Sequence, residues 1–143
     1  MKLAIALGNA IRADDGVGFV IARALAAHDP AVEIVESMEA LPEHAEAVAR
    51  AERVVFLDAS VVGAPGEVRA TEVAPRPPQV AILHALTPED VLGLAHAQHG
   101  RAPPAALVTV AGGDFSFAEG LSPEVEAAVP EALRLAFEFL SGR

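Results

Sequence analysis

The sequence predicts a single α/β domain over residues 1–143, with a mostly parallel sheet flanked by helices on both faces. Two observations support this three-layer architecture. Short apolar runs that end at polar residues alternate with stretches that have the spacing of amphipathic helices. The first three of these runs are separated by helical stretches, which implies right-handed crossovers and parallel strands. We therefore expect ligands at the carboxyl edge of the sheet, where open α/β sheets bind them.

The first strand and helix lie within residues 3–25. Residues 3–7 form a continuous apolar run typical of a buried parallel strand. Residues 17–25 carry apolar side chains at the spacing of an amphipathic helix. The loop between them contains Asp14 and Asp15. Both carboxylates are thus expected near the amino end of a helix, where its dipole stabilises negative charge.

The remaining elements are predicted from the same signals. Four further strands are expected at residues 32–35, 53–59, 67–73 and 105–110, and three further helices at residues 41–51, after Thr87 and after Ser122. Thr87 and Ser122 are each followed by a proline and by acidic residues, which indicates a capped helix start. Alternating polar residues make 67–73 an edge strand. Pro130 is expected to kink or restart the last helix.

Composition narrows the function classes. The net charge is −10 and the arginines are scattered, so a nucleic-acid partner is not expected. No apolar run approaches the length of about 18 residues that a membrane span needs. The apolar start is too short for a signal peptide, so we expect a cytoplasmic protein. Because the chain has no cysteine, a metal site must use carboxylate and imidazole ligands.

Three such side chains are predicted to meet at the carboxyl edge. Asp15 lies in the loop after the first strand, Asp58 ends the third strand, and His84 lies in the loop before the Thr87 helix. Two carboxylates and one imidazole suit an open site for a divalent transition metal. We assign Asp15 and Asp58 to catalysis and place Asp14 at the helix cap.

Each of these residues also has a simpler structural interpretation. Either aspartate of the first loop can be a helix N-cap, and Asp58 can accept hydrogen bonds from loop amides. His84 can be an ordinary loop or core histidine. The site hypothesis therefore depends on the three residues sharing one edge. Four phenylalanines are interpreted as packing residues: Phe115, Phe117, Phe137 and Phe139.

The pattern GNxxxxDDGxG after an N-terminal strand resembles the nickel–iron (NiFe) hydrogenase maturation endopeptidases. The resemblance extends through three later blocks, FLDAS, HALTPEDVLGLA and GLSPEVEAAVPEAL. It implies a five-stranded twisted sheet between helices. It also implies a metal-dependent peptidase that removes the C-terminal peptide of the hydrogenase large-subunit precursor once nickel is inserted. The family's metal ligands fall on Asp15, Asp58 and His84, with nickel supplied by the precursor, and zinc or cadmium can occupy such a site.

Two loops depart from the family pattern. After the second strand, Glu36 stands where the family has an aspartate, and the segment up to Glu39 lacks the usual glycines. After the last strand, residues 112–117 replace the frequent proline–glutamate pair. Both loops are expected to border the substrate cleft. We expect Glu36 to make its wall bulkier and more negative.

Two other functions remain open. One is a metal-binding or assembly protein of the same fold without peptidase activity, which the altered loops favour. The other is a peptidyl-tRNA hydrolase-like enzyme, which also begins with a strand, Gly-Asn and a helix. That enzyme needs a histidine soon after the asparagine and a basic face, and this sequence has neither. For a peptidase, the metal can polarise the scissile carbonyl or activate a water.

Overall fold

The computed structural model describes residues 1–79 and 85–142. They form a single α/β domain around a five-stranded sheet with strand order β2-β1-β3-β5-β4. The strands are β1 (Lys2–Leu7), β2 (Val32–Ser37), β3 (Arg53–Ser60), β4 (Val68–Val73) and β5 (Ala105–Ala111). β1, β2, β3 and β5 are parallel, and β4 pairs with β5 in the antiparallel sense. The predicted fold class and the predicted edge strand are confirmed.

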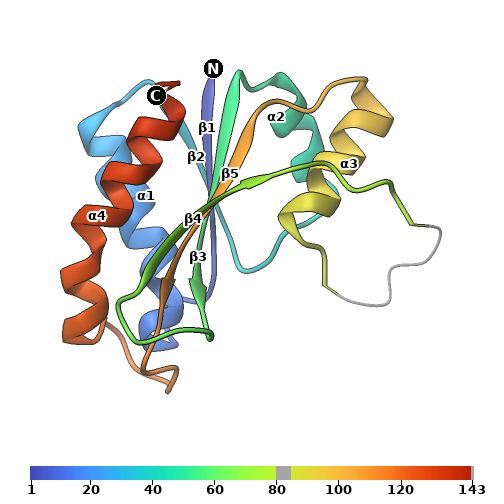
Figure 1. Cartoon of the computed structure of the whole chain (residues 1–143). Helices are drawn as coiled ribbons and strands as arrows, with labels where there is room; N and C mark the ends of the chain where they lie inside the picture. Colours follow the sequence, from blue (N-terminus) through green and yellow to red (C-terminus); the bar gives the residue numbers. More distant parts are fainter. Residues whose placement is uncertain (80–84, 143) are drawn as a thin grey trace.

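Helices cover both faces of the sheet (Figure 1). They are α1 (Val17–His28), α2 (His44–Arg50), α3 (Pro88–His99) and α4 (Pro123–Leu140), with a short 3-10 helix η1 (Ala13–Gly16) before α1. Alternate residues of a strand point to opposite faces. In β1, Ala4 and Ala6 pack in the core beneath α1 and α4, whereas Leu3 and Ile5 pack in the core beneath α2 and α3. Burial on both faces explains why the central strands are apolar throughout.

Helix α3 begins as the sequence predicts. The Thr87 hydroxyl accepts a hydrogen bond from the Asp90 amide, and the Asp90 carboxylate accepts one from the Thr87 amide. This reciprocal capping box satisfies amides that the first helical turn leaves free. Pro88 fits the first helical position because it has no amide hydrogen to satisfy.

One helix prediction needs correction, and one of two alternatives for another helix is excluded. Helix α2 begins at His44 and not at Leu41, because the helical conformation is disfavoured for a residue that precedes a proline, here Pro42. Helix α4 neither restarts nor ends at Pro130 but continues to Leu140. Its buried alanines pack on the sheet on both sides of the proline and keep the helix in one piece.

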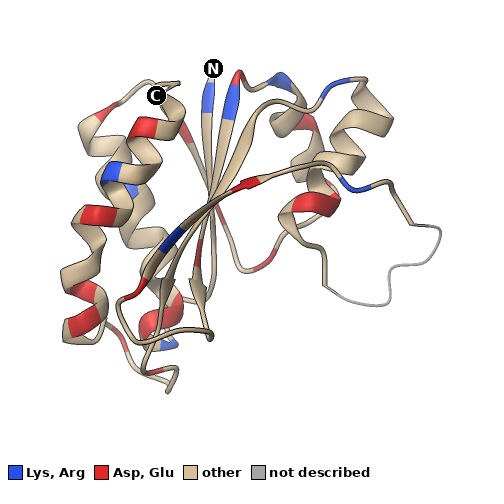
Figure 2. Ribbon diagram, in the orientation of Figure 1, with Lys and Arg blue, Asp and Glu red and all other residues tan. Residues whose placement is uncertain are grey.

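The carboxyl ends of β1, β2, β3 and β5 meet at one edge of the sheet, where many acidic residues also lie (Figure 2). The loops that follow these strands form this edge. Within residues 1–79 and 85–142, no helix has the length and apolar character needed to cross a membrane.

Candidate functional site

Glycines allow the loop with both aspartates to sit directly on the strand ends. Gly8 has φ +142°, and a side chain there would overlap the carbonyl oxygen of Asp15. A Cβ at Gly18 would lie 2.6 Å from the Leu57 carbonyl oxygen and 3.1 Å from that of Leu7. The first turn of α1 is therefore pressed against the ends of β1 and β3. This close approach explains the glycines of the GNxxxxDDGxG motif and places Asp15 at the carboxyl edge.

Asp15 and Asp58 lie close enough to influence each other. The Asn9 amide donates a 2.8 Å hydrogen bond to Asp15 Oδ2, and the Ala59 amide donates a 2.8 Å hydrogen bond to Asp58 Oδ1. Burial raises the pKa of Asp58 to about 7, against the lowering effect of the Ala59 hydrogen bond, and the charge of Asp15 raises it further. Neither carboxylate forms an ion pair within the described part of the chain. Asp58 is thus a half-buried carboxyl group next to a second carboxylate, and residues 1–79 and 85–142 supply neither of them with an ion-pair partner.

The third predicted ligand, His84, lies outside the described residues. In the part of the chain that the structure describes, no group of three histidine, aspartate or glutamate side chains is placed to hold a metal ion. Asp15 and Asp58 supply two oxygen ligands, and one imidazole would complete a donor set suited to zinc or nickel. The ligand roles of all three residues stay predictions.

Asp14 is not the cap of α1, contrary to the sequence-based assignment. Gly16 occupies the N-cap position, and no side chain caps the helix. Asp14 is fully buried and accepts four hydrogen bonds, from the amides of Gly113, Asp114 and Ser122 and from the Ser122 hydroxyl. Burial by itself would raise the pKa of Asp14, but these hydrogen bonds outweigh it and hold the pKa below its usual range. The Ser122 hydroxyl thus donates to Asp14 and does not cap α4.

The segment from Gly112 to Ser122, which we call the β5–α4 loop, packs against the loop after β1. The Ala13 amide donates to the Ala118 carbonyl at 2.8 Å, and the Ala118 amide donates to the Ile11 carbonyl at 3.1 Å. The guanidinium of Arg12 lies 4.8 Å from the ring centre of Phe117. Phe117 is 77% exposed, so the prediction that it is a packing residue is wrong.

Glu36 lies on the opposite face of the sheet from Asp58. It pairs with Ala6 in register, and Ala6 faces α1, whereas Asp58 follows the α1-facing Leu57 and points the other way. Arg23 on α1 binds both Glu36 carboxylate oxygens, at 3.0 and 3.2 Å. The expectation that Glu36 adds uncompensated negative charge to the cleft is therefore wrong.

A surface groove runs along α1 at the carboxyl edge. It consists of two hollows of about 300 and 210 Å³, which share Ala10, Phe19 and Arg23. One hollow extends to Glu119, Gly120 and Leu121, and the other extends to Glu36, Ser37 and Met38. The groove therefore joins the β5–α4 loop to the loop after β2, the two loops that depart from the family pattern.

Exposed apolar side chains gather at the same edge. Apart from Met1, every large hydrophobic residue that is exposed in the described structure belongs to this edge, and we call this set the apolar rim: Ile11, Val20, Met38, Val61, Val62 and Phe117. These residues come from the loops after β1, β2, β3 and β5 and from the first turn of α1. We interpret the apolar rim as a candidate interaction surface.

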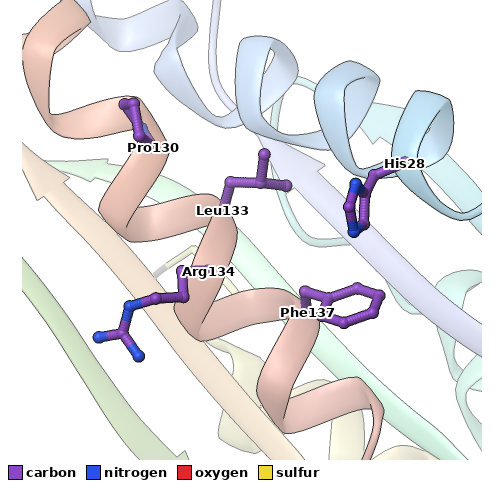
Figure 3. Close-up of a pocket in the computed structure, with 5 residues that line it drawn as sticks. All are labelled: His28, Pro130, Leu133, Arg134 and Phe137. Atoms are coloured by element: carbon purple, nitrogen blue, oxygen red, sulfur yellow. The ribbon is translucent and has the colours of Figure 1, made fainter.

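A separate hollow of about 250 Å³ lies between the end of α1 and α4 (Figure 3). The rings of His28 and Phe137 pack edge to face there, with 4.8 Å between the ring centres. Arg134 is bound by Glu131 and Glu138. Binding sites usually combine an apolar hollow with several convergent polar groups. This hollow does not, and we assign the functional site to the carboxyl edge.

The three-layer α/β fold of this chain has counterparts among solved structures. The hydrogenase maturating endopeptidase HybD from E. coli is 24% identical with a TM-score of 0.72, covering 99% of this chain and 93% of that one. The NiFe hydrogenase maturation protease HybD from Thermococcus kodakarensis is 24% identical with a TM-score of 0.73, covering 98% and 99%. A maturation protease HycI from Thermococcus kodakarensis KOD1 is 24% identical with a TM-score of 0.70, covering 98% and 90%.

These likenesses extend over nearly the whole chain, and several further hydrogenase maturation peptidases match in the same way. The chain therefore has the fold of the hydrogenase maturation proteases. No protein-family model and no curated protein sequence matches it.

Proposed function

We propose that this protein is an endopeptidase of hydrogenase maturation that removes the C-terminal peptide from a NiFe hydrogenase large-subunit precursor. The observation that carries the proposal is the combination of a whole-chain fold likeness with two interacting carboxylates at the carboxyl edge. The GNxxxxDDGxG motif supports it, because its glycines bring Asp15 onto the strand ends next to Asp58.

The surface around the carboxylates supports a protein substrate. The apolar rim comes from loops and the first turn of α1 at the same sheet edge as Asp15 and Asp58, and the groove along α1 opens at this edge. A small-molecule site would usually enclose its ligand in one concave pocket. Exposed apolar side chains at the same edge as the carboxylates suit the docking of a folded protein with an extended tail.

We assign Asp15, Asp58 and His84 as the residues that hold the metal. Nickel enters as part of the precursor, and zinc or cadmium serves as a substitute in the absence of substrate. A bound metal supplies either polarisation of the scissile carbonyl or activation of a water. The carboxylate pair fits such an ion because it has no positive partner within the described residues.

The chain's own groups orient the site and hold a proton. The Asn9 amide fixes Asp15 Oδ2, and the Ala59 amide fixes Asp58 Oδ1. With a pKa of about 7, Asp58 carries its proton over much of the acidic range and loses it near neutrality. A carboxyl group in this range can act as a general acid or base toward a water or amide in the cleft. It loses the proton more readily when a cation lies beside it.

The test is cleavage of nickel-loaded large-subunit precursors, followed by mass spectrometry of the released tail. We expect the wild type to cleave at least one precursor, and Asp58→Asn and His84→Ala to lose this activity. Glu52→Gln is the matched control, because Glu52 pairs with the amino terminus beside the start of β1. Cleavage by Asp58→Asn at the wild-type rate would contradict the assigned site.

The two altered loops favour one alternative function, that of a metal-binding or assembly protein without peptidase activity. Its distinguishing result is zinc binding that depends on Asp58 and His84, together with no cleavage of any nickel-loaded precursor. Isothermal titration with zinc, run beside the cleavage assay, separates the two functions.

A further inference from the structure

We propose that Asp14 is a positioning residue that clamps the β5–α4 loop onto the turn carrying Asp15, and that it thereby sets both the Asp15 carboxylate and one wall of the groove. The catalytic consequence rests on the proposed function, whereas the clamp itself does not. Asp14 is the only charged side chain that is fully buried in the described structure.

The clamp joins the two ends of one loop through a single carboxylate. Asp14 Oδ2 accepts from the Gly113 and Asp114 amides, both at 2.9 Å, at the start of the loop. At the end of the loop, the Ser122 amide donates to Oδ1 at 2.7 Å and the Ser122 hydroxyl donates to Oδ2 at 2.8 Å. The loop is therefore closed around Asp14.

Asp15 is held through this clamp because the two residues are neighbours in the tight turn η1. On one side of the turn, the Asp14 amide also donates to the Asp114 carbonyl at 2.9 Å. On the other side, the Asp15 carbonyl packs on Gly8, where there is no room for a Cβ. If the Asp14 side-chain contacts are lost, the turn keeps only its backbone hydrogen bonds to the β5–α4 loop, and Asp15 can move away from the Asn9 amide that orients it.

The same clamp shapes the groove. Glu119, Gly120 and Leu121 of the β5–α4 loop line it, and Phe117 of that loop belongs to the apolar rim. Loosening the loop therefore disturbs the surface that receives substrate as well as the carboxylate that acts on it. A residue with this role affects both kcat and KM, which separates it from a residue that only stabilises the fold.

A carboxylate is required at this position because all four partners are donors. In Asp14→Asn, an amide oxygen in place of Oδ2 keeps three of these hydrogen bonds, but the NH₂ group then faces the Ser122 amide, donor against donor. This nearly isosteric variant removes the charge and breaks the clamp at the Ser122 amide with a minimal change in volume. Ser122→Ala is a milder variant, because it removes the hydroxyl donor alone and leaves the three amides in place.

The first experiment uses ¹⁵N NMR on the protein without metal or substrate. It measures the chemical shift of the Asn9 amide and the hydrogen-exchange rates of the Gly113, Asp114 and Ser122 amides. We expect Asp14→Asn to shift the Asn9 amide signal and to accelerate exchange of all three loop amides at least about tenfold. Ser122→Ala should give smaller changes of the same kind. The matched control is Leu140→Ala, which lowers stability by opening the buried end of α4 far along the chain from this loop. We expect its Asn9 signal to be unchanged.

The second experiment measures precursor cleavage well below the melting temperature of each variant. We expect Asp14→Asn to lower kcat about 100-fold, as a misplaced catalytic group does, and to raise KM. Leu140→Ala should retain both constants. Normal kinetics in Asp14→Asn, or an unmoved Asn9 signal in both Asp14→Asn and Ser122→Ala, would overturn the proposal. If the wild type cleaves no precursor, the proposed function is wrong. The NMR experiment by itself then tests whether Asp14 clamps the loop.

Discussion

Asp14 and Asp58 are both acidic residues at the carboxyl edge, yet their surroundings shift their pKa values in opposite directions. Asp14 is buried among four donors, which keep its pKa low. Asp58 is half-buried, with one amide donor and the neighbouring charge of Asp15, and its pKa rises to about 7. A structural carboxylate needs donors that satisfy its charge. A carboxylate that exchanges a proton or binds a cation needs fewer donors.

The first prediction concerns the pH dependence of stability at Asp58. Because the folded pKa of about 7 lies above the ordinary value of 3.8, the Asp58 contribution to stability is fully present below pH 3.8 and is lost as the pH rises through 7. Asp58→Asn removes this loss. We expect the variant to be more stable than wild type at pH 8 by on the order of 2–4 kcal/mol, and to differ little from it at pH 4. Urea unfolding of both proteins at the two pH values tests this, and parallel pH profiles would contradict it.

The second prediction concerns Asp14. The sequence alone suggests that Asp14→Ala costs about 1 kcal/mol, the usual effect of a lost helix cap. The structure predicts about 2–4 kcal/mol, because four hydrogen bonds to a charged group are lost and buried donors are left without an acceptor. Denaturant unfolding at pH 7 measures the difference. Asp15→Ala is the comparison, and we expect it to cost less because, in the described structure, the Asp15 carboxylate accepts a hydrogen bond from the Asn9 amide alone.

At the scale of elements, α1 is held against the sheet at its amino end by Gly18. In a helix, replacing glycine with alanine ordinarily gains about 1 kcal/mol. Here a Cβ would lie 2.6 Å from the Leu57 carbonyl oxygen, so we expect Gly18→Ala to destabilise the protein by about 1–3 kcal/mol instead. Thermal unfolding gives the sign of the effect. A stabilised variant would mean that α1 does not press on β3 at this point.

The pair of Arg23 on α1 and Glu36 on β2 gives the next prediction. The Arg23 side chain is largely exposed and the Glu36 side chain is partly exposed, so Glu36→Gln should change stability by no more than about 1 kcal/mol. It should, however, free the Arg23 charge within the groove and improve the binding of tails with acidic residues. Binding of acidic and neutral tail peptides to both proteins measures this. In the double variant Arg23→Gln, Glu36→Gln, the gain for acidic tails should disappear.

At the scale of the whole molecule, the candidate carboxylates share one edge with all the exposed large hydrophobic residues of the described structure except Met1. We expect Phe117→Ser and Met38→Ser to weaken precursor binding about tenfold each, since each removes a large apolar contact. Stability should hardly change, because these side chains are 77% and 71% exposed. Titration with precursor tests the binding, and unchanged affinity in both variants would remove the rim from the docking surface.

Local signals in the sequence were sufficient to predict the helices and strands. The run of apolar residues before Asp58 predicts β3, and the Thr87 to Asp90 segment predicts the start of α3, because the partners lie within a few residues of each other. The placement of Asp15 and Asp58 at one edge also follows from sequence, since the carboxyl ends of parallel strands always meet there. The fold class, the edge and the placement of Asp15 and Asp58 at that edge were thus available without a structure.

Only the tertiary structure decided what the individual charges do. Ser122 donates to Asp14 across 108 residues of sequence, and Glu36 binds Arg23 on a helix that precedes it. No local pattern separates a capping aspartate from a clamped one, because both precede a helix in the same way. Their difference lies in which donors the rest of the chain brings to each carboxylate. These donors are set by packing between segments that are distant in the sequence, and the pattern of neighbouring residues carries no information about that packing.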